Sequence, residues 1–139
     1  MSELTTLSTV SAQQSAAASS DDKLARVCGE VAAVFKRAWG RGPVRTTAHW
    51  AGPNLLVIIL QNGHTEAEKT LRAAGHLQEL LGGRHLLQVL IEDDLKASVE
   101  RILGVPVVTM LSATRLDPDL SAEIFVIGNE PGGAPFERS

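Results

Sequence analysis

The sequence predicts an α+β fold, a two-layer sandwich in which helices pack on one face of a mostly antiparallel, four-stranded sheet. Two β-rich runs lie close together at 44–61, and two more lie at 107–127. Runs this close in sequence favour hairpins. Apolar residues recur at helical spacing before the first pair and between the pairs. Paired strands combined with separate helices in the order αββααββ are typical of such a sandwich.

Length and composition limit the class of protein. The 139 residues fit one domain, and a hydrophobic content of 44% is enough for a core. The net charge of -3 disfavours a nucleic-acid partner, which usually meets a basic excess. The longest aliphatic run, at 55–60, is far shorter than the about 20 residues that span a bilayer. We therefore expect a soluble, cytoplasmic domain without direct membrane insertion.

Both ends of the chain are expected to be tails. Residues 1–19 are mostly Ser, Thr, Ala and Gln and lack the cationic start and apolar stretch of a secretory signal. Their composition predicts a disordered N-terminal tail. The Gly- and Pro-containing segment 129–139 predicts a flexible C-terminal tail. A single domain over residues 20–128 remains.

The first element is an amphipathic helix. Ser20 and the two aspartates that follow it can cap free backbone amides, so the helix is expected to start there. Apolar residues then recur at spacings of three and four. These residues are Leu24, Val27, Val31, Val34, Phe35 and Ala38. The Gly-Arg-Gly-Pro turn at 40–43 ends the helix, because glycine tolerates positive φ and proline cannot continue it.

Two strands follow. Residues 44–50 alternate between two faces, as a half-exposed strand does. Residues 55–61 are apolar without alternation, which predicts that both faces of this strand are covered. The turn-forming residues at 51–54 favour a hairpin. Helices should cover one face, and a partner subunit or another part of the chain should cover the other.

Two helices are expected between the hairpins. Thr65 and Glu68 match a capping box, in which each side chain accepts a hydrogen bond from the other residue's backbone amide. The first helix should run from there to about Leu81 and end at the two glycines of 82–83. The second should span 84–103. Its apolar face is Leu87, Ile91, Leu95, Val99 and Ile102.

The last two strands are expected at 107–112 and 122–127, with a loop at 113–119 between them. Within this loop, Asp117 and Asp119 flank Pro118. Two carboxylates in a loop could hold a divalent cation, or one could pair with Arg115. The favoured interpretation is that Asp-Pro-Asp builds the turn.

An anion site is the candidate binding site. Backbone amides of the 40–43 turn, with Arg41 and Arg45, would favour a phosphate or carboxylate. A helix stop with solvated arginines is the favoured alternative. If the 113–119 loop lies nearby, Arg115 would join the site, with Asp117 orienting an arginine.

Other residue chemistry predicts no reaction. The histidines lack the close helical spacing of a zinc enzyme. Cys28, the single cysteine, excludes an internal disulfide and is expected to be a buried, inert thiol. Serine motifs of hydrolases are absent from the sequence. We therefore expect no catalytic residues, no metal and no cofactor, and we expect that the protein is not an enzyme.

The order of these motifs resembles a known bacterial family. Gly-Arg-Gly-Pro at 40–43 precedes an apolar strand and Thr-x-x-Glu at 65–68. Val-x-x-x-x-Ser-x-Thr-x-x-Asp-Pro-Asp at 107–119 is followed by Ala-Glu-Ile-Phe-Val-Ile at 122–127. Over residues 20–128 the chain resembles the Na-translocating system protein MpsC-like family, also called YbcI-like domains of unknown function. The matching positions are Gly42, Pro43, Thr65, Glu68, Thr114, Asp117, Pro118 and Asp119.

The resemblance implies a soluble domain associated with a membrane system for cation translocation and inorganic-carbon supply, with no catalytic role assigned to these positions. Our first hypothesis is a non-enzymatic accessory or regulatory domain that acts through protein–protein contact as a homodimer. The two apolar faces of 55–60 need more cover than two short helices supply, and a symmetric dimer would supply it. The alternative is a small-anion or nucleotide sensor that binds through Arg41, Arg45 and Arg115.

Overall fold

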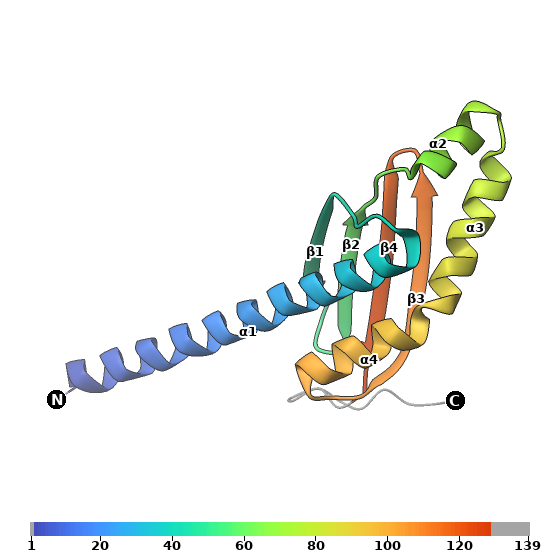
Figure 1. The fold of residues 1–139 in the computed structure, drawn as a ribbon. Helices are drawn as coiled ribbons and strands as arrows, with labels where there is room; N and C mark the ends of the chain where they lie inside the picture. The colour runs from blue at the N-terminus through green and yellow to red at the C-terminus, as the bar shows by residue number, and fades with distance from the viewer. Residues whose placement is uncertain (1, 129–139) are drawn as a thin grey trace.

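A computed structural model confirms the α+β prediction (Figure 1). It describes residues 2–128, with side chains from residue 20 onward. In chain order the elements are α1 (Ser2–Trp39), β1 (Arg45–Trp50), β2 (Leu55–Gln61), α2 (Glu66–Ala73), α3 (Leu77–Leu90), α4 (Glu92–Leu103), β3 (Val107–Leu116) and β4 (Asp119–Ile127).

The four strands form one antiparallel sheet in the order β1-β2-β4-β3. The two expected hairpins, β1–β2 and β3–β4, lie side by side and are joined by pairing of β2 with β4. In this central pairing Ile58 lies opposite Glu123, and Leu56 lies opposite Phe125. Helices α1, α3 and α4 cover the same face of the sheet (Figure 1).

The core lies between this face and the helices. Apolar faces predicted for α1 and α4 supply one side, and alternate residues of β2 and β4 supply the other. Its fully buried members include Val27, Val31, Phe35, Leu56, Ile58, Leu60, Leu95, Val99, Phe125 and Ile127. The apolar residues spaced three and four apart on the helices and the alternate residues of the strands therefore pack in one cluster.

The predicted start of the first helix at Ser20 is wrong. The helix α1 begins at Ser2 and is 38 residues long. Residues 2–19 contain neither glycine nor proline, so they can continue the helix toward the N-terminus. The structure thus gives a helical backbone, projecting beyond the sheet in Figure 1, to a segment for which the sequence predicts disorder. The predicted tail at 129–139 lies outside the described residues.

The predicted division between the middle helices is also wrong. Instead of two helices separated at 82–83, three helices connect the hairpins. The first break falls at Gly75, which adopts a φ of 82°. Gly82 and Gly83 lie inside α3, and a Cβ added at either position would meet nothing within 4 Å. A second break falls at Ile91, whose side chain stays in the core although the helix direction changes.

The second hairpin has longer strands than expected. The β3 strand continues to Leu116 and β4 starts at Asp119, so most of the predicted loop at 113–119 is paired. Asp117 and Pro118 alone form the turn, through a cis peptide bond. The interpretation of Asp-Pro-Asp as a turn-builder agrees with this geometry. The pairing of Leu116 with Asp119 places the Asp119 side chain at a fixed point of the sheet.

The face of the sheet opposite the helices is open in the described part of the chain (Figure 1). Leu56, Ile58 and Leu60 point into the core, whereas Leu55, Val57 and Ile59 are half-buried on the opposite face. The sequence predicted that both faces of this strand are covered, and within residues 2–128 only one is.

No helix within residues 2–128 is both long and apolar enough to span a membrane.

Candidate functional site

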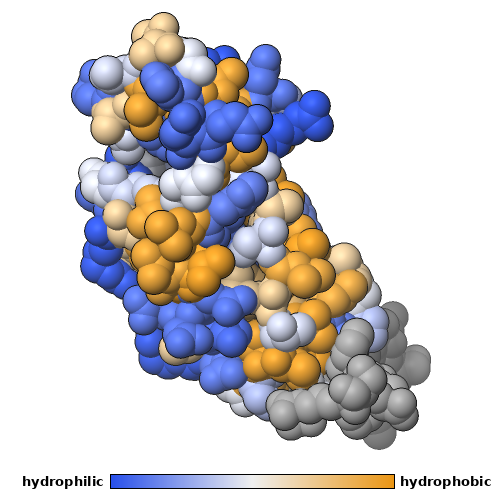
Figure 2. Space-filling view, turned by 90° about the vertical axis from the view of Figure 1, so that its right-hand side faces the viewer, coloured by the Kyte–Doolittle hydropathy of each residue, from blue (hydrophilic) through white to orange (hydrophobic). Residues whose placement is uncertain are grey.

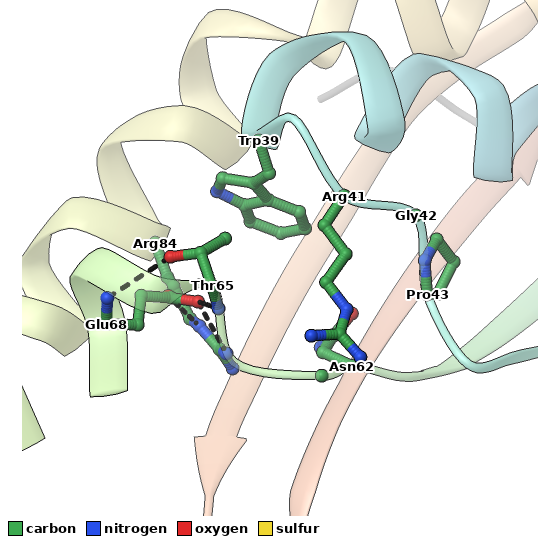
Figure 3. A pocket seen from close by; sticks show the side chains of 9 residues that line it. Trp39, Arg41, Gly42, Pro43, Asn62, Thr65, Glu68 and Arg84 are labelled. Atoms are coloured by element: carbon green, nitrogen blue, oxygen red, sulfur yellow. Dashed lines mark hydrogen bonds and ion pairs between the residues drawn. The ribbon is translucent and has the colours of Figure 1, made fainter. Parts of the chain in front are cut away.

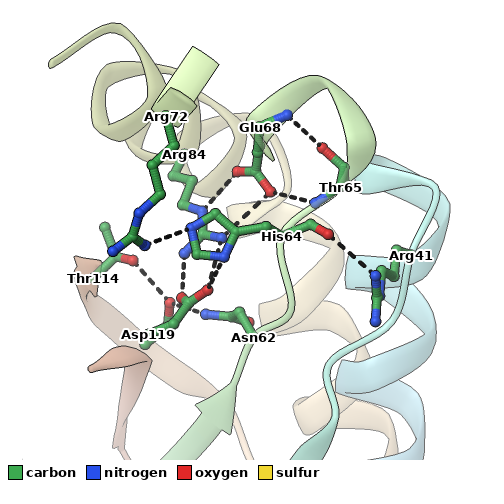
Figure 4. Close-up of polar contacts among 10 residues, drawn as sticks. Arg41, Asn62, His64, Thr65, Glu68, Arg72, Arg84, Thr114 and Asp119 are labelled. Carbon is green, nitrogen blue, oxygen red and sulfur yellow. Dashed lines mark hydrogen bonds and ion pairs between the residues drawn. The ribbon is translucent and has the colours of Figure 1, made fainter. Parts of the chain in front are cut away.

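A cluster of charged side chains joins α2, α3 and the start of β4, and Arg84 of α3 is at its centre (Figure 4). The Arg84 side chain is 2% exposed. Its Nε donates to Glu68 Oε2 at 2.8 Å, and its Nη2 donates to Asp119 Oδ2 at 3.1 Å. Two further bonds, from Nη1 to Asp119 and from Nη2 to Glu68, make both contacts bidentate.

The predicted capping box sets the position of Glu68. Thr65 Oγ1 accepts from the Glu68 amide at 3.2 Å, and Glu68 Oε1 accepts from the Thr65 amide at 3.0 Å. The prediction is therefore confirmed, but it covers only half of what Glu68 does. The same carboxylate caps α2 and binds Arg84, so the start of α2 is tied to α3.

His64 extends the cluster. Its Nδ1 lies 3.2 Å from Asp119 Oδ2, and its Nε2 lies 3.2 Å from Arg72 Nη1. A neutral ring with its proton on Nδ1 would donate to the carboxylate and accept from the guanidinium, so it satisfies both contacts. The His64 carbonyl accepts from Arg41 Nη1 at 3.1 Å.

The ionised forms of the central pair are favoured. Burial lowers the pKa of Arg84, but hydrogen bonds to Asp119 and Glu68 and their negative charges raise it by more, so the net shift is upward. Burial raises the pKa of Glu68, but hydrogen bonds from Arg84 and the Thr65 amide lower it by more, so this carboxyl ionises more readily than usual. Arg84 and Glu68 thus stabilise each other's charge.

This arrangement is suited to holding elements together. The donors of Arg84 point at carboxylates of the protein itself, and both carboxylates are occupied by donors. The Arg84 guanidinium therefore has few N–H donors left to bind an anion. In the described residues, no group of three His, Cys, Asp or Glu side chains could hold a metal ion.

A small pocket adjoins the cluster (Figure 3). Trp39 and Arg41, at the end of α1, form one side, and Arg84 contributes to the other. The Arg41 guanidinium lies so close to Gly63 that a Cβ there would be 3.1 Å from it. The family-pattern residues Gly42 and Pro43 also line this pocket, together with Asn62, Thr65 and Glu68.

The three arginines of the predicted anion site lie on different elements of the fold. Arg41 lines the small pocket, whereas Arg45 and Arg115 lie on the two edge strands. Arg45 pairs with Gln61, and Arg115 pairs with Leu120 across the sheet. Three strand spacings of about 4.8 Å separate the two edge strands, or roughly 14 Å. Anion binding by Arg41, Arg45 and Arg115 stays a prediction.

The residues of the predicted Asp-Pro-Asp motif have separate roles. Asp119 contacts Arg84 and His64, so it is part of the cluster. The Asp117 backbone carbonyl accepts from Arg115 Nε at 3.1 Å. Arg115, whose pairing with a carboxylate was one alternative for this loop, thus binds a backbone carbonyl.

Thr114, another position of the family pattern, takes part in a chain of hydroxyl and amide groups beside the cluster. Asn62 Nδ2 donates to Ser121 Oγ at 2.7 Å, and Ser121 Oγ donates to Thr114 Oγ1 at 3.0 Å. These contacts connect the end of β2 with β4 and β3.

A second polar contact anchors α3 one turn beyond Arg84. Gln88 Nε2 donates to Glu123 Oε1 at 2.9 Å, and the Ser112 hydroxyl donates to the other carboxyl oxygen. The Glu123 side chain is fully buried between α3 and the sheet. Burial raises the pKa of Glu123 to about 7, although the hydrogen bonds from Ser112 and Gln88 lower it; the nearby charge of Glu92 adds to the rise.

Sequence patterns did not single out Arg84, Arg72, Asn62, Gln88 or His64 as site residues. One signal was present: Leu80, Arg84 and Gln88 recur at spacing four and continue to Ile91. A charged residue on an otherwise buried helical stripe needs a partner. Cys28 is half-buried, and burial raises the pKa of its thiol, as expected for an unreactive cysteine.

The fold and the cluster define a small α+β domain with helices on one face of an antiparallel sheet. At the end of that sheet, the buried ion pairs of Arg84 hold α2, α3 and β4 together. The model of the family described as "Na+-translocating membrane potential-generating system (MpsC)" matches residues 20–129. The chain belongs to this family. No curated protein and no solved structure matches the chain.

Proposed function

We propose that the chain is a non-enzymatic accessory or regulatory domain of a membrane cation-translocating system, and that it acts through protein–protein contact as a homodimer. The family description supports the link to such a system. We take the domain to be non-enzymatic because the sequence contains no serine-hydrolase or zinc-enzyme motif. The observation that carries the proposal is the open apolar face of the sheet.

This open face is continuous across all four strands. One row contains His49, Val57, Ile124 and Leu111, which are neighbours in the strand register. The next row contains Thr47, Ile59, Ala122 and Ala113. Leu111 is 61% exposed, a large apolar side chain left in solvent.

The open face is large enough for a second copy of the chain. Four strands about 4.8 Å apart and four rows about 6.8 Å apart cover roughly 19 Å by 27 Å. Protruding side chains increase the accessible area toward the about 800 Å² per partner of a standard interface. Arg45 and Arg115 lie in one row at one end. A two-fold axis perpendicular to the strands would place them against the opposite end of the partner's face, which keeps like charges apart.

The test is the solution mass of the full chain by light scattering. We expect wild type to have twice the chain mass of 14.8 kDa. Leu111→Asp should be monomeric, because each dimer would bury two new charges. Val44→Asp is the matched control: Val44 is 69% exposed and lies just before β1, and this variant should stay dimeric. A monomeric wild type, or a dimer unchanged by Leu111→Asp, would contradict the proposal.

A further inference from the structure

Helix α3 turns polar side chains toward the sheet and large apolar side chains toward solvent. The side facing the sheet contains Arg84 and Gln88, whereas Leu86, Val89 and Leu90 are 60%, 70% and 67% exposed. An amphipathic helix normally places its apolar stripe inward. This concentration of exposed apolar side chains on one helix therefore needs an explanation.

The orientation of α3 is fixed by its polar contacts. Arg84 is bound to Glu68 and Asp119, and Gln88 is bound to Glu123. Turning the apolar residues inward would break these buried contacts and leave charges unpaired. The exposed stripe is thus a stable feature of the fold.

The stripe continues into a groove. The groove lies between the end of α1 and helices α2 and α3, and its apolar lining is Ala38, Trp39, Leu71, Leu80, Gly83 and Leu87. Figure 2 shows an apolar patch on this side of the molecule, bordered by hydrophilic residues above and below. We call the groove together with Leu86, Val89 and Leu90 the α3 surface.

Two features of the α3 surface indicate what binds there. In the part of the chain that the structure describes, the buried Trp39 Nε1 has no hydrogen-bond acceptor, and such a donor is costly to leave unpaired. Gly83 leaves the groove floor open, because a Cβ there would meet nothing within 4 Å. An incoming segment could therefore lie close to α3 and pack against the Trp39 side chain that lines the groove.

The charge around the α3 surface is mainly acidic. Glu79 lines the groove, and Asp93 and Asp94 follow Leu90 at the exposed start of α4. Asp93 is 97% exposed and its contact with Lys96 is long, at 3.8 Å. The neighbouring His76 lies 3.4 Å from Glu79. This balance favours a partner that carries positive charge beside its apolar residues.

We propose that the α3 surface binds a basic amphipathic helix of a partner protein, in the helix-in-groove mode. Apolar residues of the partner at spacings of three and four would cover Leu86, Leu90 and Leu87, and its Lys or Arg residues would face Asp93 and Asp94. The inference rests on the proposed function, in that the domain works by protein contact. It uses a surface other than the open sheet face, so the dimer can fail while this site stands.

The probe is a labelled 14-residue leucine–lysine peptide with leucine at helical spacing, and the leucine–glutamate peptide of the same pattern is its counterpart. Binding is followed by fluorescence anisotropy and by Trp39 emission in a Trp50→Phe background. We expect saturable binding of the leucine–lysine peptide with a change in Trp39 emission. The leucine–glutamate peptide should bind at least about tenfold more weakly, because it repels the acidic rim.

Variants then locate the site. A Cβ at position 83 meets nothing within 4 Å, so Gly83→Leu should place its side chain in the groove and weaken binding at least about tenfold. Leu90→Ser and the pair Asp93→Lys with Asp94→Lys should weaken binding by a similar factor. Gly29→Leu is the matched control: it is also an exposed helical glycine with open space, on α1 outside the groove, and it should bind like wild type.

Equal binding of both peptides, or wild-type binding by Gly83→Leu and Leu90→Ser, would overturn the proposal. A change of wild-type dimers into monomers by Gly83→Leu would also overturn it, because the α3 surface would then be covered by a second copy. Loss of dimers in Leu111→Asp with peptide binding retained would support it, since the two surfaces would be independent.

Discussion

Arg84 of α3 donates to both carboxylate oxygens of Asp119, 35 residues away at the start of β4. The same guanidinium binds Glu68 through two bonds, so three elements meet at one buried side chain. Breaking these contacts would leave buried charges without partners, and the positions of the two carboxylates set how α3 lies on the sheet. The pairing fixes α3 in the orientation that turns Leu86, Val89 and Leu90 outward.

We expect Arg84→Met to lower the free energy of unfolding by about 3 kcal/mol, because two neighbouring carboxylates lose their common partner. Urea unfolding at pH 7 measures the loss. Arg84→Lys should recover part of it, since a lysine keeps the charge but not both bidentate contacts.

Arg101→Met is the control for Arg84→Met. The pair of Arg101 with Glu30 spans 3.1 Å, but the two side chains are 60% and 45% exposed. Its loss should cost under about 1 kcal/mol. If both variants lose the same stability, the buried ion pairs of Arg84 do not stabilise the fold more than an exposed pair does.

Thr65→Ala should lower the stability by about 1 kcal/mol, because the first turn of α2 loses its side-chain acceptor. Thr65→Ser keeps the hydroxyl and should be close to wild type. The comparison is made by thermal unfolding at neutral pH. A loss of the same size in Thr65→Ser would mean that the methyl group, and not the cap, matters.

Local patterns predicted much of the fold. The apolar face of α1 and the capping box of Thr65 and Glu68 depend on residues three or four positions apart, and both are confirmed. The register that joins β2 to β4 follows from no local signal, although its outcome, an antiparallel sheet, was expected.

The cluster could not be predicted in this way. Arg84 meets Glu68 and Asp119 at separations of 16 and 35 residues, and these contacts exist only once the hairpins are joined. The expected break at Gly82 and Gly83 also misplaced Arg84 at the start of a helix. In such cases the backbone angles that a glycine adopts decide the break, and the sequence shows only that a glycine is present.

The glycines therefore offer a direct comparison. Gly82→Ala should raise the stability by about 0.5–1 kcal/mol, because Gly82 is inside a helix and a Cβ would meet nothing within 4 Å. Gly75→Ala should lower it by about 1–2 kcal/mol, since the φ of 82° at this break is strained for alanine. Thermal and urea unfolding of both variants test the helix boundaries. A stabilising Gly75→Ala would place the break elsewhere.

The raised pKa of Glu123 predicts that the stability of the fold depends on pH. Its pKa is about 7 in the folded protein, and the ordinary value is 4.5. Below pH 4.5 the carboxyl is protonated in both states and has no effect on stability. As the pH rises from 4.5 to 7, the unfolded chain ionises first, so folding becomes less favourable. Above pH 7 the loss is constant, on the order of 3 kcal/mol.

Glu123→Gln should remove this loss. The glutamine carbonyl can accept from Gln88, and its amide can donate to the Ser112 hydroxyl, so the buried contacts survive without a charge. We expect the variant to be more stable than wild type at pH 8 and the difference to shrink toward pH 5. The other titratable groups are common to both proteins and cancel in the difference. A difference that does not change between pH 5 and pH 8 in urea unfolding would show that Glu123 has no raised pKa.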